Sequence, residues 1–199
     1  MKLWVDAASP DEIAEWAAHP WVSGFTTNPS LMVGLTGLNP GGGMAWAQDA
    51  VEAANGKPIS IDGPPEVWDL GPNVYRKVTD PTRTNFQGWR NLTAVCSVRQ
   101  ADVELLDGDI ISVFCGRIMD TGRDPQPVID AARATGAQVL WASVREPYNI
   151  TQAEQMGCDI ITVPPAILRK YLEWNAMPLE TVAELTIAQF DKDREGLWT

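Results

Sequence analysis

Short apolar runs alternate along the chain with longer segments in which apolar residues recur at helical spacing. The runs predict eight strands: Lys2–Asp6, Gly24–Thr27, Pro58–Asp62, Asn73–Val78, Asn91–Val95, Asp109–Phe114, Gln138–Ala142 and Asp159–Val163. Strands that alternate with helical segments are typical of βαβ units and a parallel sheet. Eight strands in this order predict an α/β protein built as a compact (β/α)8 TIM barrel.

The helical segments between these strands are Pro10–Ala18, Met44–Ala54, Val98–Leu106, Asp124–Thr135, Tyr148–Met156, Pro165–Leu172 and Leu179–Asp191. The first begins with strong signals, because Ser9 can cap it, Pro10 suits its first position and Glu12 completes a capping box. The segment Leu35–Gly43 is a loop rich in glycine and proline. Its three consecutive glycines follow no strand and lack the Lys-Ser/Thr ending of a phosphate loop, so we interpret the segment as a hinge or linker.

Two of the expected crossovers are too short to hold a full helix. Only the ten residues Gly63–Pro72 separate strands three and four, and only the twelve residues Thr79–Arg90 separate strands four and five. A whole βαβ unit usually needs about 30 residues, so we expect loops or single turns in both places. Each short crossover contains one tryptophan, Trp68 or Trp89. These rings either cover the barrel face that the missing helices leave open or lie at a subunit interface.

Composition narrows the class of protein. The 199 residues are 45% hydrophobic and 21% charged, which is ordinary for one globular domain spanning residues 1–199. No apolar run approaches the ~20 residues of a membrane span, and the N-terminus lacks a signal-peptide core, so we expect a cytoplasmic protein. The net charge of −11 argues against nucleic acid and anionic membranes as partners. Three scattered cysteines and one histidine give no metal or disulfide framework.

Lys77 is the first candidate for chemistry. It lies near the C-terminal end of the predicted strand Asn73–Val78, where alternation places Tyr75 and Lys77 on one face and Val74 and Arg76 on the other. Burial disfavours the ammonium form and lowers the pKa of a lysine. A neutral amine attacks carbonyl carbons, which is the requirement for Schiff-base chemistry. The alternative is a lysine whose amine reaches past the strand end into water.

Other polar residues follow the strands at the same end, where parallel barrels carry their working groups. They are Asp6, Thr26, Thr27, Asn28, Asp62, Asn91, Thr93, Ser112, Arg117, Ser143 and Arg145. Carboxylates can shuttle the protons of imine chemistry, and hydroxyl and amide groups can bind sugar hydroxyls. Two arginines can hold a phosphate group by bidentate hydrogen bonds.

The chain resembles the transaldolase family, which also contains the small fructose-6-phosphate aldolases. The motifs that carry the resemblance are Val5-Asp6, Gly24–Ser30 (GFTTNPS), Asn73–Val78 (NVYRKV), Asn91–Thr93 (NLT), Ser112–Ile118 (SVFCGRI) and Trp141–Arg145 (WASVR). The resemblance implies a barrel whose Schiff-base lysine stands on strand four, at Lys77. It also implies that no metal or organic cofactor takes part.

The resemblance further implies a role for each polar residue. Asp6 would transfer protons, and Asp62 stands where transaldolases carry a glutamate that acts through a water molecule. The residues that would contact substrate are Thr26, Asn28, Asn91, Thr93 and Ser112, with Arg117, Ser143 and Arg145 at the phosphate. The alternatives are that Thr26, Thr93 and Ser112 cap strand ends, that Asp6 binds backbone amides, and that the arginines form surface ion pairs. The chain departs from the family at Thr79, where a proline is usual.

The resulting hypothesis is a Schiff-base transaldolase of the pentose phosphate pathway type, which moves a dihydroxyacetone unit between sugar phosphates. Asp62 and Phe114 favour transfer, since the aldolase branch carries glutamine and tyrosine at these positions. The alternatives are a fructose-6-phosphate aldolase, and a catalytically weak minimal barrel that only binds sugar phosphates. We also expect a homo-oligomer, because the C-terminal helix at about 179–191 and the thin wall near strands three to five offer surface for self-association.

Overall fold

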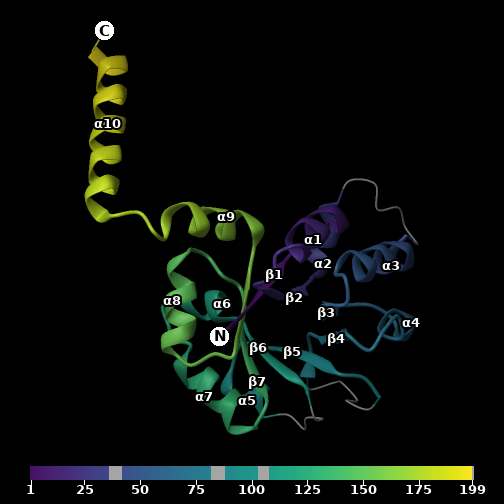
Figure 1. The fold of residues 1–199 in the computed structure, drawn as a ribbon. Coiled ribbons are helices and arrows are strands. Elements are labelled where there is room, and N and C mark those ends of the chain that lie inside the picture. The colour runs from purple at the N-terminus through teal and green to yellow at the C-terminus, as the bar shows by residue number, and fades with distance from the viewer. Residues whose placement is uncertain (36–41, 82–87, 103–107, 199) are drawn as a thin grey trace.

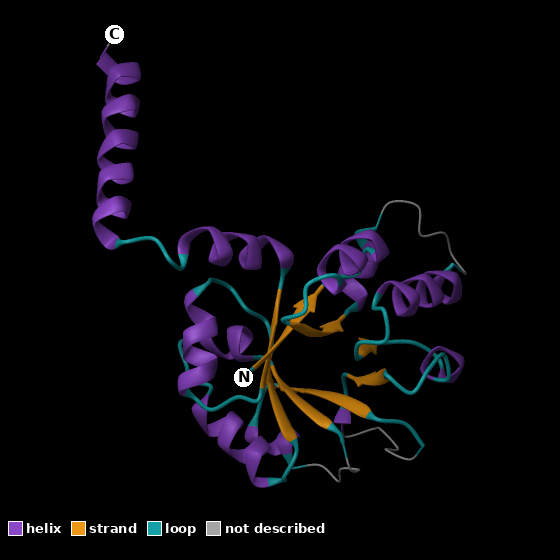
Figure 2. Ribbon diagram, viewed as in Figure 1, coloured by secondary structure: helices purple, strands orange, loops and turns teal. Residues whose placement is uncertain are grey.

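The computed structural model describes residues 1–35, 42–81, 88–102 and 108–198. Eight parallel strands form a closed barrel in chain order, and β1 pairs with β8 to complete the ring (Figure 2). The strands are β1 (Lys2–Asp6), β2 (Val22–Thr26), β3 (Ile59–Ile61), β4 (Val74–Val78), β5 (Asn91–Val95), β6 (Ile110–Val113), β7 (Gln138–Trp141) and β8 (Ile160–Val163). The (β/α)8 barrel expected from the sequence is therefore confirmed.

Helices surround the strands on the outside of the barrel, except for the last helix, which extends away from it (Figure 1). They are α1 (Pro10–Ala17), α2 (Pro29–Val33), α3 (Gly43–Ala53), α4 (Pro65–Trp68), α5 (Val98–Ala101), α6 (Cys115–Met119), α7 (Gln126–Ala134), α8 (Tyr148–Gln155), α9 (Pro165–Trp174) and α10 (Leu179–Trp198). Within the described ranges, none of these helices is long and apolar enough to cross a bilayer.

Several details differ from the sequence-based expectations. Ser9 is the N-cap residue of α1, but its side chain makes no capping hydrogen bond, so the capping box is not formed; Glu12 pairs instead with Arg169 at 3.4 Å. The helix α10 continues well beyond the predicted end at Asp191. The short helices α2 and α6 were not predicted. Part of the predicted helix Val98–Leu106 and part of the loop Leu35–Gly43 lie outside the described residues.

The third crossover is reduced to the single turn α4, as predicted. Trp68 ends this turn and packs against the apolar core, and its indole N–H donates to the carbonyl oxygen of Ile61 at 3.1 Å. The Trp68 ring also meets that of Trp89, with centroids 5.2 Å apart, and the guanidinium of Arg76 lies 4.9 Å from its centroid. Trp68 thus covers the thin wall beside β3 and β4. Residues 82–87 of the fourth crossover lie outside the described residues.

The interior of the barrel is filled by one layer of large side chains. This inner layer consists of Trp4, Tyr75, Leu92, Ile110, Leu140 and Ile160; Ala142 packs against them from two residues beyond Leu140. The indole of Trp4 fits because β2 has a glycine beside it: a Cβ on Gly24 would lie 2.5 Å from the indole ring. Because side chains alternate along a strand, the residue two positions after each member faces the same interior, nearer the C-terminal end. The inner layer therefore closes the barrel interior below the C-terminal ends of the strands.

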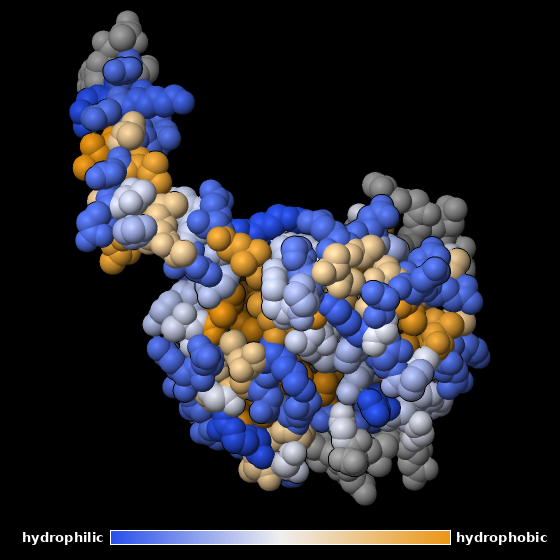
Figure 3. Space-filling model, in the orientation of Figure 1, coloured by the Kyte–Doolittle hydropathy of each residue, from blue (hydrophilic) through white to orange (hydrophobic). Residues whose placement is uncertain are grey.

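The C-terminal helix α10 extends away from the barrel (Figure 1). It carries large apolar side chains that are exposed, among them Ile187 at 60%, Phe190 at 62% and Leu197 at 75%. Figure 3 shows apolar side chains on this helix, separate from the surface of the barrel. Its apolar side chains consequently lack the burial that would stabilise a long amphipathic helix in water.

Candidate active site

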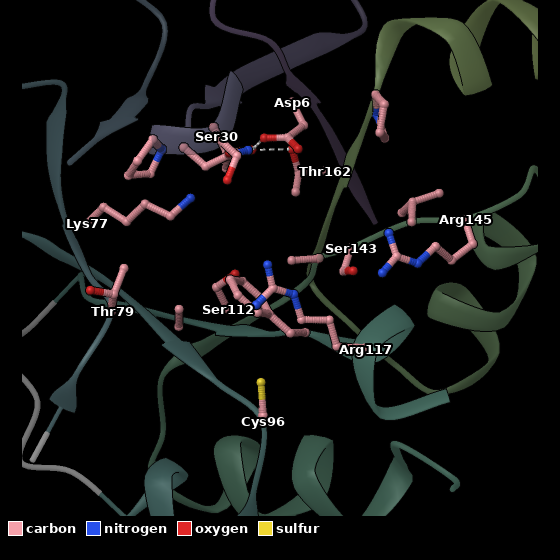
Figure 4. Close-up of a pocket in the computed structure, with 18 of the residues that line it drawn as sticks. Asp6, Ser30, Lys77, Thr79, Cys96, Ser112, Arg117, Ser143, Arg145 and Thr162 are labelled. Carbon is pink, nitrogen blue, oxygen red and sulfur yellow. Dashed lines mark hydrogen bonds between the residues drawn. The ribbon is translucent and has the colours of Figure 1, made fainter. Parts of the chain in front are cut away.

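A cavity of about 410 Å³ opens at the C-terminal ends of the strands, above the inner layer. Eight of the residues predicted from the sequence line it: Asp6, Thr26, Asn28, Lys77, Ser112, Arg117, Ser143 and Arg145. Figure 4 shows Lys77 and Asp6 facing the cavity from one side and Arg117 and Arg145 approaching it from the other. The candidates Thr27, Asp62, Asn91 and Thr93 are absent from this lining.

Lys77 occupies the interior position two residues beyond Tyr75 on β4, and only 8% of its surface is exposed. Its amine donates a hydrogen bond to the backbone carbonyl of Thr27. Burial lowers the pKa of Lys77; the carboxylates of Asp6 and Asp62 oppose this shift, and the positive charge of Arg117 adds to it. The amine is thus held in place at a site that favours its neutral, nucleophilic form.

Asp6 ends β1 two residues beyond Trp4, directly beside Thr26 on β2. One carboxylate oxygen accepts a hydrogen bond from the Thr26 hydroxyl at 2.7 Å. Burial raises the pKa of Asp6, while the charge of Lys77 and hydrogen bonds from Thr26 and Asn28 act against that rise. A carboxyl group whose pKa lies above its usual range can both give and take a proton near neutral pH.

The segment after β2 explains how Asn28 is positioned. Its side-chain oxygen accepts the backbone N–H of Leu31 at 3.0 Å and so caps α2, which begins at Pro29. With the oxygen engaged in the cap, the amide nitrogen is available to donate into the cavity, toward Asp6. The preceding residue, Thr27, donates its hydroxyl to the carbonyl of Ser60 at 2.9 Å, which ties this segment to β3.

The two arginines come from neighbouring loops that touch. Arg117 lies on α6, with its guanidinium 4.9 Å from the ring centroid of Phe114. Arg145 pairs with Asp120 at 2.8 Å, and both side chains are about half exposed. The loops meet where Gly116 faces the backbone of Ser143: a Cβ on Gly116 would lie 1.7 Å from the Ser143 carbonyl oxygen. This close approach brings both guanidinium groups to the same rim of the cavity.

Besides Thr27, three of the predicted residues do not line the cavity. Asn91 is the first residue of β5, so the sequence-based placement at the C-terminal end requires correction: its amide binds Asp109 and the carbonyl of Trp89 at the opposite end of the barrel. Thr93 alternates with Leu92 and Ala94, which face the interior, and is buried on the other side of β5. Asp62 follows β3 and is half buried; burial raises its pKa and the charge of Lys77 lowers it.

Other lining residues were not predicted to belong to the site: Ser30, Thr79, Cys96, Gln100 and Thr162. Cys96 comes directly after β5 and continues the alternation of Leu92 and Ala94, so alternation alone could have placed it. Thr162 lies two residues beyond Ile160 on β8 and is 4% exposed. It was hidden in a continuous apolar run, although it is the one hydroxyl in that run.

The chain is similar in sequence to known proteins. The family described as Transaldolase/Fructose-6-phosphate aldolase matches residues 89–197, more than half of the chain. The chain belongs to this family. A probable transaldolase of Mesorhizobium japonicum is 32% identical to this family member, over 85% of this chain and 88% of the relative. A probable transaldolase of Thermus thermophilus is 28% identical, over 87% of this chain and 91% of the relative.

A solved structure of a variant of the citrate synthase SbnG is similar in fold alone. It superimposes on this transaldolase-family chain with a TM-score of 0.57 at 14% sequence identity, covering 98% of this chain and 94% of the other. At this level of sequence identity the similarity shows the barrel fold alone, and function has to be argued from the residues of the site.

Proposed function

We propose that the protein is a Schiff-base transaldolase that transfers a dihydroxyacetone unit from a ketose phosphate to an aldose phosphate, as in the pentose phosphate pathway. One observation carries the proposal: the buried amine of Lys77 shares a cavity with the carboxyl group of Asp6 and with two guanidinium groups. A dry nucleophile, a proton-transfer group and an anion-binding rim are the parts that this reaction needs.

The reaction begins when the neutral Lys77 nitrogen adds to the ketone carbon C2. The π bond of the carbonyl group breaks, and one proton of the nitrogen passes to the former ketone oxygen, which gives a carbinolamine. Asp6 donates a proton to the resulting carbinolamine hydroxyl, which leaves as water and gives a protonated imine. The Asp6 carboxylate then takes the proton of the C4 hydroxyl as the C3–C4 bond breaks, and the electron pair of that bond moves into the enamine. Addition of the enamine carbon to an acceptor aldehyde, followed by hydrolysis of the imine, returns the amine. The protonated imine serves as the electron sink, so no metal or organic cofactor is required.

Binding follows from the same lining. Arg117 and Arg145, with the hydroxyl of Ser143 between their loops, would hold the phosphate group at the rim. Asn28 and Ser112 also line the cavity and would contact the sugar hydroxyls. Asp62 would act on the imine from beyond Lys77 through a water molecule, since it feels the lysine charge without lining the cavity.

Borohydride reduction in the presence of fructose 6-phosphate tests the central step. Intact mass spectrometry should show one covalent adduct on the wild-type chain and none on Lys77→Ala. Lys170→Ala, which removes an exposed lysine of α9, is the matched control and should keep the adduct. No adduct on the wild type, or an undiminished adduct on Lys77→Ala, would refute the Schiff-base mechanism and leave a sugar-phosphate-binding barrel.

The aldolase alternative is separated by the fate of the dihydroxyacetone unit. A transferase needs an acceptor, so turnover of fructose 6-phosphate should depend on erythrose 4-phosphate. An aldolase releases free dihydroxyacetone when no acceptor is present. Release at the same rate with and without the acceptor would favour the aldolase.

A homo-oligomer formed through α10 is part of the proposal. Leu185, Ile187 and Phe190 are 47%, 60% and 62% exposed, and exposed apolar side chains on a long helix favour association. We expect a solution mass that is a multiple of the 21.8 kDa chain. The double substitution Ile187→Glu and Phe190→Glu should lower this mass. A wild-type monomer by light scattering would contradict the inference.

A further inference from the structure

Three neighbouring strands each contribute one polar side chain to the cavity wall. The strand β1, which carries Asp6, lies between β2, which carries Thr26, and β8, which carries Thr162. The register pairs Asp6 with Thr26 and Trp4 with Thr162. The Thr162 hydroxyl lies 2.7 Å from the Thr26 hydroxyl, which lies 2.7 Å from the Asp6 carboxylate. We call this series of contacts the hydroxyl chain. It joins the proton-transfer carboxylate to a strand that the sequence motifs do not include.

The direction of these hydrogen bonds is set by the charge of Asp6. An ionised carboxylate only accepts, so the single hydroxyl proton of Thr26 is used in the bond to Asp6. The contact between the two threonines then needs a donor, and Thr162 is the group that can supply it. When Asp6 is protonated, its own O–H can donate to Thr26 and Thr26 to Thr162. The hydroxyl chain can therefore satisfy both protonation states without moving a heavy atom.

We propose that Thr162 is a positioning residue that acts through the Thr26 hydroxyl to fix the orientation and the proton affinity of the Asp6 carboxyl group. This inference rests on the proposed function, in which Asp6 moves the protons of the imine. A donor to Thr26 polarises its O–H bond and strengthens the hydrogen bond that Thr26 gives to the carboxylate. Both threonines are at least 96% buried, so water cannot readily replace a lost hydroxyl.

Other titratable groups also lie near Asp6. Those around the main cavity are Lys77, Cys96, Arg117 and Arg145, with Asp62 beyond Lys77; those around a second, smaller hollow that Asp6 also lines are Glu12 and Arg169. Among these groups, the charge of Lys77 lowers the pKa of Asp6 across space, whereas the hydroxyl chain contacts the carboxylate directly. Removing the hydroxyl of Thr162 leaves all of these charges unchanged.

The test compares Thr162→Val, which keeps the shape and removes the hydroxyl, with Thr162→Ser, which keeps the hydroxyl. The pKa of Asp6 is read from its carboxyl carbon by NMR without substrate, and the signal is assigned by its loss in Asp6→Asn. Loss of the donor weakens a hydrogen bond to the charged form, so Thr162→Val should raise this pKa by roughly 0.2 to 0.6. Thr162→Ser should restore the wild-type titration.

A double substitution tests whether the effect passes through Thr26. Adding Thr162→Val to Thr26→Val should cause no further shift, because the link to Asp6 is already broken. In turnover, the acidic limb of the kcat/KM profile should move in the same direction, with a loss of about threefold to thirtyfold in kcat. Equal titrations in Thr162→Val and wild type would overturn the proposal, as would a further shift in the double variant. Because the NMR titration needs no turnover, this outcome is distinct from failure of the proposed function.

Discussion

Replacing Gly24 by alanine tests whether the inner layer supports the active site. The added Cβ would lie 2.5, 2.7 and 2.8 Å from three atoms of the Trp4 indole. Ordinary carbon contacts begin at about 3.5 Å, so the ring or the strand must move by about 1 Å. Trp4 is 2% exposed and its ring meets that of Tyr75 edge-on at 6.1 Å, which leaves the indole little room to move away. Overpacking of this kind costs about 1–3 kcal/mol.

The same displacement reaches the site, because Asp6 and Lys77 stand two residues beyond Trp4 and Tyr75 on their strands. A shift of about 1 Å in reacting groups can cost about a hundredfold in rate. At 2–4 °C per kcal/mol for a chain of this size, the midpoint of thermal unfolding should fall by roughly 2–12 °C. Circular dichroism and steady-state kinetics measure the two effects.

The control is Gly43→Ala, at the start of α3, where an added Cβ would meet nothing within 4 Å. We expect this substitution to leave stability unchanged or to raise it slightly. The second control adds Trp4→Phe to Gly24→Ala, and the smaller ring should recover part of the loss. Wild-type stability and kcat in Gly24→Ala would refute the assignment of Trp4 as a rigid floor.

Three further predictions follow from the site and the thin wall. Burial lowers the pKa of Lys77 from its ordinary 10.5, so the charged lysine destabilises the folded state below that pH. Lys77→Met should therefore raise the unfolding temperature at pH 7, and this gain should shrink as the pH rises toward 10.5. A gain that stays constant with pH would contradict this reasoning. Asp120→Asn frees Arg145 from an exposed ion pair and should lower the KM for a ketose phosphate by about 1.5- to 5-fold, with no change for dihydroxyacetone. Trp68→Ala should cost about 2–4 kcal/mol in urea unfolding, because it removes the contacts with Trp89 and the core, and a loss below about 0.5 kcal/mol would show that the thin wall does not need it.

Much of the fold was predictable because the strands of a barrel are short and almost wholly apolar. The bounds of β1 and β5 agree with prediction at both ends, and the position of Lys77 on the interior face followed from simple alternation. Asn91 was nevertheless misplaced: the predicted strand already began at this residue, yet Asn91 was grouped with Thr93 at the C-terminal end. A buried amide can serve the bottom of the barrel as readily as the top.

Other parts of the site depend on contacts between distant segments. The short helix α6 and the positive φ of 64° at Ser143 belong to a junction between two loops, and no local pattern encodes it. Thr162 was overlooked because one hydroxyl in a run of β-branched residues looks like ordinary strand composition. The predicted capping box at Ser9 is also absent, and here too a distant segment is involved, because Glu12 forms an ion pair with Arg169 of α9.

The junction of Gly116 with Ser143 has a consequence for anyone who wishes to redesign what the enzyme accepts. The two segments are in close backbone contact, and even a methyl group at residue 116 would force them apart. Libraries that vary one segment while keeping the other should therefore yield mostly inactive clones. Exchanging the segments around Gly116 and Ser143 together, both taken from the same donor barrel, is the better route to altered selectivity.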